Sequence, residues 1–125
     1  MSQAVRAADQ YRELDLATRV ACASPEQLVS MLFDGLRAAL RAAERAIAQH
    51  QPGPRIRAVT RALSILDGLE SSLDFAAGGS VARALAALYG ELRALIVAGN
   101  AEARPELLGV AADRVGTLGA AWGQI

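Results

Sequence analysis

The sequence contains very few aromatic residues and no lysine. Aromatic side chains make up 4% of the 125 residues, and all thirteen basic residues are arginine. Runs of Val, Ile and aromatic residues with the period of two that marks strands are also missing, and Ala and Leu supply most of the 53% hydrophobic content. This pattern favours helices over strands. The length predicts one domain with a sizeable core.

An excess of charge of either sign is absent as well. Thirteen basic residues balance thirteen acidic ones, and no basic block occurs. We therefore expect no nucleic-acid partner. No apolar stretch approaches the about eighteen residues of a membrane span, so we expect no membrane insertion. The opening "MSQAVRAADQ" lacks the apolar centre of a secretion signal, which favours a cytosolic protein.

Residues suited to catalysis or metal binding are scarce. Cys22 is the single cysteine, so an internal disulfide is excluded, and it has no histidine at a recognisable spacing. We interpret His50, the only histidine, as a cation at a helix C-terminus or a solvated side chain; phosphotransfer is the alternative. One histidine cannot supply the paired Glu-x-x-His motifs of a di-iron bundle. We expect no enzyme activity, no cofactor and no metal.

Four long helices are predicted after an irregular segment, residues 1–23. The first has a strong start signal, because Ser24 is a favoured N-cap, Pro25 suits the first helical position, and Gln27 completes a capping box. It should end near His50, since "QPGPR" cannot continue a helix.

The other three helices are bounded by glycine, serine and proline. The second is expected from about Pro54 to Leu73, before a turn formed by the paired glycines of "AAGGS". The third should be capped by Ser80 and stop at "AGN", and the fourth should have Pro105 in its first turn. Short connections between long helices predict an antiparallel up-down four-helix bundle over residues 24–125, with residues 1–23 as a mobile N-terminal arm.

The fourth predicted helix is unusually rich in glycine. It contains Gly109, Gly116 and Gly119, and each glycine costs about 1 kcal/mol relative to Ala in a helix interior. We therefore expect this helix to depend on packing and to be the part most prone to fray or adjust.

The first predicted helix has more apolar surface than a bundle requires. Its polar side chains follow one narrow track, Ser30, Asp34, Arg37, Arg41 and Arg45. Interleaved acidic residues favour a solvated, salt-bridged face over an anion-binding ridge for these arginines. A bundle needs roughly three of every seven positions apolar, and the surplus predicts an interaction protein.

The same helix carries a family resemblance. The segment "ASPEQLVSMLFDG", residues 23–35, resembles a hallmark of the flagellin secretion chaperones of the FliS family. "GGSVARALAALYGELRALIVAGN" is similar to the third helix of that family, including the Leu88-Tyr89 pair. Trp122 falls where the last helix of the family carries a tryptophan, and Tyr11 resembles the tyrosine of the N-terminal arm. The resemblance covers essentially the whole chain.

The resemblance implies a function. A member of this family would be a cytosolic export chaperone that binds the C-terminal region of unpolymerised flagellin in an apolar groove. It would prevent premature polymerisation and deliver flagellin to the flagellar export gate. The flagellin region would form helices while wrapping around the chaperone, in the helix-in-groove mode. The arm, residues 1–23, would lie over part of the groove as a lid that moves when flagellin binds.

The candidate flagellin-binding residues come from the arm and from three helices. They are Tyr11, Leu14, Leu16, Phe33, Leu36, Ile65, Leu69, Leu88, Tyr89 and Leu92. For the seven helical candidates, packing in the core is the favoured alternative to a flagellin contact. For the whole chain, the alternative is a non-catalytic helical bundle that uses its surplus apolar face to form a homodimer or to act as an adaptor.

Overall fold

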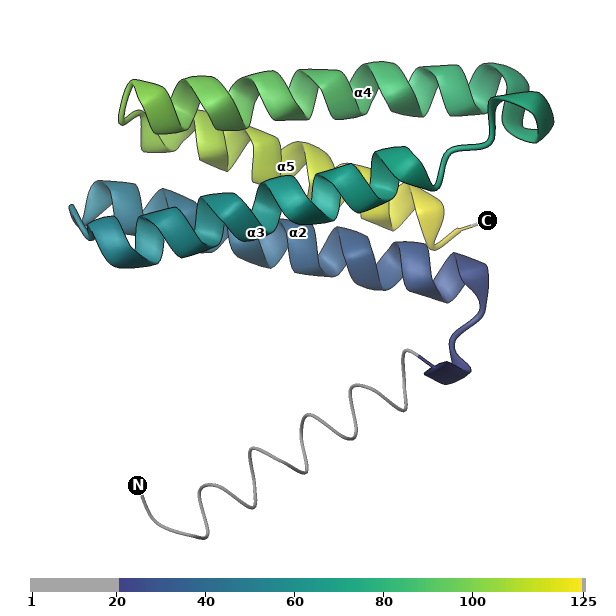
Figure 1. Cartoon of the computed structure of the whole chain (residues 1–125), viewed down its shortest axis with the longest axis horizontal. Coiled ribbons are helices and arrows are strands. Elements are labelled where there is room, and N and C mark those ends of the chain that lie inside the picture. The colour runs from purple at the N-terminus through teal and green to yellow at the C-terminus, as the bar shows by residue number, and fades with distance from the viewer. Residues whose placement is uncertain (1–20, 125) are drawn as a thin grey trace, which may run out of the picture.

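The described part of the chain folds into a bundle of four helices. They lie side by side along the long axis of the bundle (Figure 1). The structure is a computed structural model, and it describes residues 21–124. The helices are α2 (Pro25–Ala48), α3 (Pro52–Ser71), α4 (Phe75–Ala101) and α5 (Pro105–Trp122). Three-residue connections make consecutive helices antiparallel, so the predicted all-α up-down bundle is confirmed.

Helix α2 begins as the sequence predicts. The Ser24 hydroxyl accepts a hydrogen bond from the Gln27 backbone N–H at 3.2 Å, and the Gln27 side chain accepts one from the Ser24 N–H at 2.8 Å. This reciprocal capping box satisfies two N–H groups that a helix start otherwise leaves without partners.

The boundary between α3 and α4 differs from the prediction. Helix α3 ends at Ser71, and α4 begins at Phe75 rather than at Ser80. Asp74 is the N-cap of α4, because its Oδ1 accepts hydrogen bonds from the N–H groups of Ala76 (3.1 Å) and Ala77 (3.0 Å). The paired glycines therefore lie inside α4. Gly79 has a φ of 53° and a ψ of −124°, which kinks the helix just before Ser80.

Helices α2 and α4 both end in a Schellman motif. After α2, the N–H of His50 bonds the carbonyl of Ile47 (3.2 Å) and the N–H of Gln51 bonds that of Ala46 (2.9 Å). Ala103 takes the equivalent position after α4. His50 (φ 55°) and Ala103 (φ 52°) are therefore left-handed, a conformation that favours glycine.

The core is lined almost entirely by Leu, Ala, Ile and Val from all four helices. The fully buried large side chains are Phe33, Leu36, Leu40, Leu66, Leu69, Tyr89, Leu92, Ile96, Leu108 and Val115. Around the bundle, α2 packs against α3 and α5, and α4 closes the other side against the same two helices. The backbone of α2 approaches its two neighbours more closely than α4 does.

The glycines of α5 explain its close approach to α2. A Cβ on Gly109 would overlap the Glu44 carboxylate, one on Gly116 would lie 3.3 Å from Arg37 Nε, and one on Gly119 would contact Phe33. All three glycines thus face α2. The glycines that lower the helix propensity of α5 also let it pack closely.

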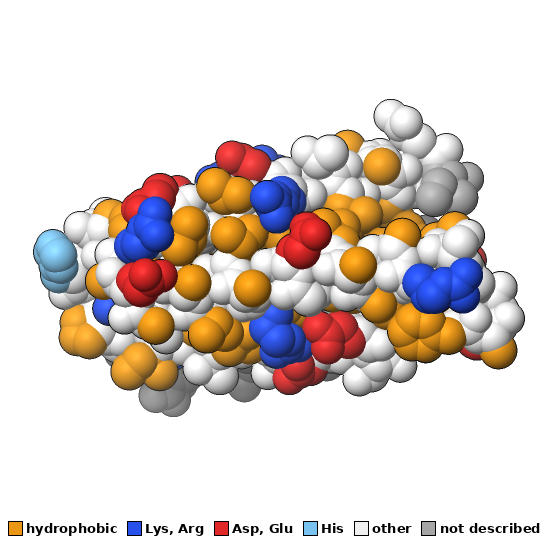
Figure 2. Space-filling model, turned by 90° about the horizontal axis from the view of Figure 1, so that it is seen from above, with side chains coloured by type: hydrophobic (Ala, Val, Ile, Leu, Met, Phe, Trp, Pro, Cys, Tyr) orange, Lys and Arg blue, Asp and Glu red, His pale blue; other side chains and the backbone are white. Residues whose placement is uncertain are grey.

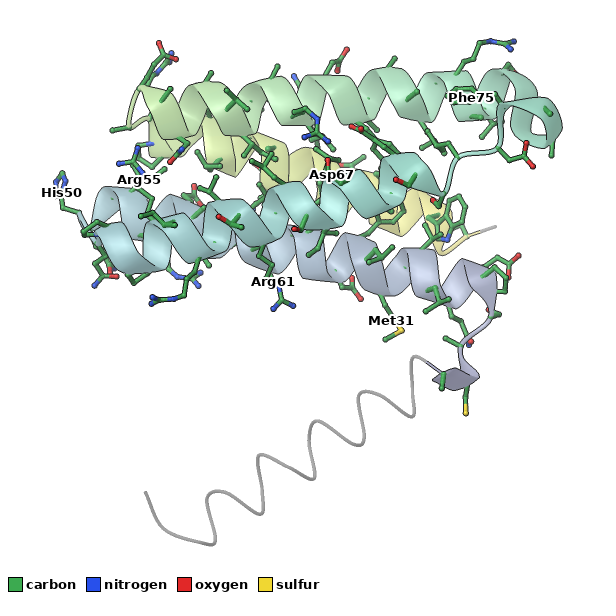
Figure 3. All side chains as sticks on the ribbon, viewed as in Figure 1. Met31, His50, Arg55, Arg61, Asp67 and Phe75 are labelled. Carbon is green, nitrogen blue, oxygen red and sulfur yellow. The ribbon has the colours of Figure 1, made fainter. Side chains whose placement is uncertain are left out.

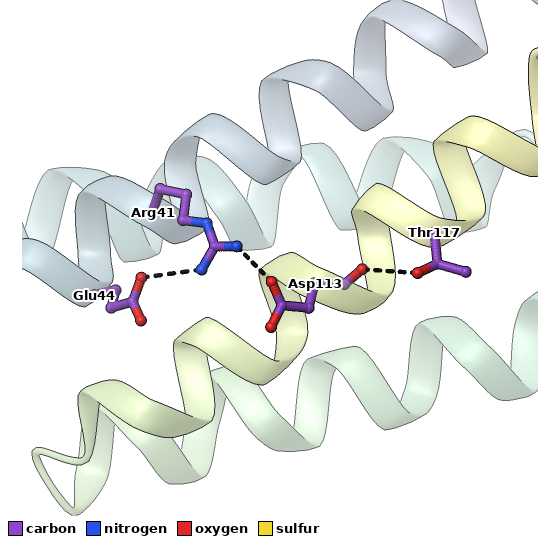
Figure 4. A network of polar contacts seen from close by, with 4 residues as sticks. All are labelled: Arg41, Glu44, Asp113 and Thr117. Carbon is purple, nitrogen blue, oxygen red and sulfur yellow. Dashed lines mark hydrogen bonds and ion pairs between the residues drawn. The ribbon is translucent and has the colours of Figure 1, made fainter.

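Ion pairs join neighbouring helices on the outside of the bundle. Arg41 of α2 donates to Asp113 of α5 at 2.5 Å and to Glu44 of its own helix at 3.2 Å (Figure 4). The hydrogen bond that Arg41 donates to Asp113 is the main reason why the pKa of Arg41 is raised. Arg93 of α4 pairs with Asp67 (2.6 Å) of α3 and with Glu70. The salt-bridged character predicted for the arginine track of α2 is present at Arg41.

Helix α3 turns Arg55, and not the neighbouring Ile56, toward the bundle at its start. Ile56 is 66% exposed, and Arg55 occupies the inward position. Its Nε donates to Asn100 Oδ1 at 2.8 Å, and its terminal nitrogen donates to the Asn100 carbonyl near the end of α4. Figure 3 shows Arg55 directed toward α4.

Candidate partner-binding surface

Side chains suited to catalysis are dispersed over the described part of the chain. Within residues 21–124 no three His, Cys, Asp or Glu side chains gather in a way that could hold a metal ion. His50 projects into solvent at one end of the bundle (Figure 3), and Cys22 is exposed. Among the described helices, none combines the length and the apolar character needed to cross a membrane.

An apolar hollow lies at the end of the bundle where α2 begins and α5 ends. We call it the end cleft. It has a volume of about 680 Å³ and lies between the first turns of α2, the α3–α4 connection, the start of α4 and Trp122. Its apolar lining includes Val29, Leu73, Val81 and Leu85. This volume falls in the range of about 300–1,000 Å³ typical of binding sites.

Two aromatic residues border the end cleft. The Trp122 ring meets Phe33 edge to face, with 6.0 Å between ring centroids, and its Nε1 donates to the Glu26 carbonyl at 3.1 Å. Tyr89 also lines the cleft, although its side chain is only 2% exposed. Burial, and to a smaller extent the charge of Glu70, raise the pKa of Tyr89.

Within the described part of the chain, the two charged residues that line the end cleft are both acidic. Glu26 lies in the first turn of α2, and Asp74 caps α4. Neither forms an ion pair with any side chain in the described residues. The cleft is therefore an apolar hollow with an acidic rim.

A second apolar hollow lies between α4 and α5. We call it the side groove. It has a volume of about 450 Å³, and its lining includes Leu88, Thr117, Leu118 and Ala121. Arg114 at its edge donates to Glu91 across the two helices at 3.5 Å.

Exposed apolar residues lie at the edge of the end cleft and beyond the two hollows. The large ones are Ile56, Phe75, Val81, Val97 and Val110. Figure 2 shows apolar side chains interleaved with charged ones over one face of the molecule. In Figure 3 Phe75 lies where the chain enters α4, at the same end of the bundle as the end cleft. Phe75 and Val81 therefore extend the apolar surface at this end.

The predicted flagellin-binding residues fall into three groups. Five are at most 2% exposed and pack in the core: Phe33, Leu36, Leu69, Tyr89 and Leu92. Ile65 and Leu88 are half-buried, with Leu88 in the side groove and Ile65 against Gly35 of α2. The arm residues Tyr11, Leu14 and Leu16 lie outside the described residues.

Sequence reasoning did not find Glu26, Asp74, Phe75 and Val81 as parts of one surface. Asp74 followed by Phe75 and two alanines was a signal for a helix start, but Ser80 offered a second one six residues later. Glu26 was recognisable only as part of the first turn of α2. The fold brings Glu26 and Asp74 together across 48 residues of chain.

Comparison with known proteins gives consistent matches. The model of the family described as "Flagellar protein FliS" matches residues 7–125. The flagellar secretion chaperone FliS of Salmonella typhimurium is 30% identical over 116 residues, which cover 92% of this chain and 86% of that protein. FliSB of Pseudomonas aeruginosa, also a flagellar secretion chaperone, is 30% identical over 84% of this chain and 83% of its own length. The flagellar secretion chaperone FliS of Vibrio cholerae is 27% identical over 92% of this chain and 85% of its own length.

Proposed function

We propose that this chain, which belongs to the FliS family of flagellar proteins, is an export chaperone for flagellin and not an enzyme. The observation that carries the proposal is the family match over residues 7–125, together with relatives named flagellar secretion chaperones. The chain would act in the cytoplasm, keep flagellin unpolymerised and deliver it to the flagellar export gate. No cofactor is required for this role.

The guest would be the C-terminal region of flagellin, which folds into helices as it binds. Such a guest needs a long apolar surface, because ordering a disordered segment costs several kcal/mol. The end cleft, the side groove and the exposed valines of α4 and α5 supply apolar surface of this kind. Leu88 and Ile65 are the helical contact candidates with accessible side chains.

The N-terminal arm would act as a lid for part of this surface. In this proposal Tyr11, Leu14 and Leu16 cover apolar residues in the free chaperone and leave them when flagellin arrives. A lid would limit the aggregation that an uncovered apolar patch promotes. Deletion of residues 1–17 should then change flagellin affinity while the bundle remains folded.

The test is a calorimetric titration of the full chain with the C-terminal segment of flagellin from the same organism, accompanied by circular dichroism. We expect a one-to-one complex with a Kd below about 1 μM, a negative heat-capacity change and a gain in helicity. Absence of binding by a folded, monomeric chain would overturn the proposal. Self-association that depends on concentration, with no flagellin binding, would support the homodimer alternative.

Substitutions at two leucines of α4 should distinguish a flagellin contact from a position in the hydrophobic core. Leu88→Ala removes a half-buried side chain of the side groove, so we expect weaker flagellin binding with a small loss of stability. Leu92→Ala empties a fully buried site and should lower the free energy of unfolding by about 2–5 kcal/mol. The contact role of Phe33, Leu36, Leu69 and Tyr89 is testable with the same pair of measurements.

A further inference from the structure

We propose that the end cleft receives a guest helix that carries arginine or lysine beside its apolar stripe, and that Glu26 and Asp74 pair with that basic residue. This inference rests on the proposed chaperone function and specifies the chemistry of one part of its guest. It assigns to two acidic side chains a role in selecting how the guest is oriented.

The shape of the end cleft favours a helix over a small ligand. The apolar lining does not stop at the hollow, because Val81 is 63% exposed at its edge and Phe75 is 52% exposed at the start of α4. An occupant that covers both the hollow and these two side chains must be elongated. An amphipathic helix presents apolar side chains three and four residues apart and fits this requirement.

The acidic rim favours a basic occupant over a neutral one. Glu26 and Asp74 line the hollow, and among residues 21–124 no Arg or His lines it. A purely apolar helix laid over the hollow would remove water from both carboxylates without giving them a partner, which is unfavourable. The partial positive charge of the two helix starts compensates each carboxylate only in part. A guest Arg or Lys at the rim would replace the lost hydrogen bonds to water with charge-assisted hydrogen bonds to the carboxylates.

The charge of the whole molecule does not account for such an attraction. The chain has a formal net charge of zero, so a basic guest is not drawn to the protein in general. Any electrostatic preference must come from the local distribution of charge. Glu102, which is exposed at the end of α4 and distant in the chain from both rim residues, provides a matched control.

The experiment uses the full chain, the C-terminal flagellin segment, and the variants Glu26→Gln, Asp74→Asn and Glu102→Gln. Each variant changes net charge by the same amount, and asparagine is as good an N-cap as aspartate, so α4 should keep its start. Trp122, the only tryptophan, lines the cleft and reports binding by fluorescence. Denaturation by urea checks that each variant is folded.

We expect each rim variant to weaken binding by about two- to fivefold at low ionic strength and to reduce its dependence on salt. Glu102→Gln should change neither quantity. A series of guest segments, each with one Arg or Lys replaced by Gln, should be titrated against the unmodified chain and the rim variants. One guest substitution should weaken binding to the unmodified chain but not to a rim variant, and this identifies the paired residue.

Three results would overturn the inference. Rim variants that bind like Glu102→Gln, while the unmodified chain still binds flagellin, would refute the rim pairing and leave the chaperone function intact. Failure of the unmodified chain to bind flagellin would refute the proposed function itself. Rim variants that alter only self-association, or only the effect of deleting residues 1–17, would assign the cleft to a second copy or to the chain's own arm.

Discussion

The Trp122 indole N–H donates a hydrogen bond to the carbonyl of Glu26, at 3.1 Å and across 96 residues of sequence. This bond fastens the last turn of α5 to the first turn of α2, and the indole also packs edge to face on Phe33. The contact closes the bundle at the end that holds the end cleft.

Trp122→Phe should separate the two parts of this contact. Phenylalanine keeps an aromatic edge near Phe33 but cannot donate to the Glu26 carbonyl, so we expect a loss of about 1 kcal/mol in the free energy of unfolding. Trp122→Ala should cost more, because it removes the ring contact as well. Urea denaturation followed by circular dichroism measures both, and a Trp122→Phe variant as stable as the unmodified chain would contradict the role given to the hydrogen bond.

Two glycines of α4 should respond in opposite ways to the same substitution. A Cβ on Gly99 would overlap Leu108 and crowd the Arg104 carbonyl, so Gly99→Ala should destabilise the fold by about 1–3 kcal/mol. A Cβ on Gly90 would meet nothing within 4 Å, and Gly90→Ala should stabilise the helix by up to about 1 kcal/mol. Thermal or urea denaturation compares them, and stabilisation by both substitutions would show that packing at Gly99 adjusts more readily than the structure implies.

The end of α4 offers a stabilising change. Ala103 is left-handed, at a cost of about 1–2 kcal/mol for an L-residue, and glycine adopts this conformation without that cost but loses more backbone entropy. Ala103→Gly should therefore raise the free energy of unfolding by about 0.5–1 kcal/mol. Ala94→Gly, an exposed position inside the same helix, should lower it by about 1 kcal/mol. If both variants lost stability, the Schellman motif at Ala103 would not persist in solution.

Tyr89 should make the free energy of unfolding depend on pH in the alkaline range. Burial raises the pKa of its phenol in the folded chain above the ordinary value of 10.0. At a pH between the pKa of Tyr89 in the unfolded chain and its higher pKa in the folded chain, the unfolded chain has lost the proton and the folded chain has kept it. The free energy of unfolding should therefore fall as pH rises above about 10. Denaturation at increasing pH should show a smaller decline for Tyr89→Phe, and tyrosinate absorbance should show late titration of one tyrosine. Identical pH profiles for the two proteins would contradict this assignment.

The elements that could be predicted from the sequence are those fixed by neighbouring residues. The start of α2 depends on Ser24, Pro25 and Gln27 alone, so local chemistry was sufficient. The start of α4 was missed because Asp74 and Ser80 are both good caps, and the choice depends on the kink at Gly79. Neither the exposure of Ile56 nor the inward turn of Arg55 was visible, because Arg55 is held by Asn100 on another helix.

The candidate surface was less predictable than the fold. An apolar surplus predicts an interaction protein, but the pattern alone cannot separate a core leucine from a contact leucine. Leu88 and Leu92 lie one helical turn apart on α4, yet the first lines the side groove and the second is fully buried. The end cleft depends on the packing of three distant segments, and no local motif encodes it.

The two left-handed residues lie together, and they lie away from the end cleft. His50 and Ala103 border the same small hollow at the end of the bundle where α2 and α4 finish, whereas Glu26, Asp74 and Trp122 gather at the other end. Conformational cost and the proposed recognition surface are thus spatially separated in this protein. Glycine substitutions at the end of the bundle that holds His50 and Ala103 should therefore raise stability without touching the end cleft. A trade-off between stability and activity arises when a strained residue belongs to the recognition surface, and this arrangement avoids it.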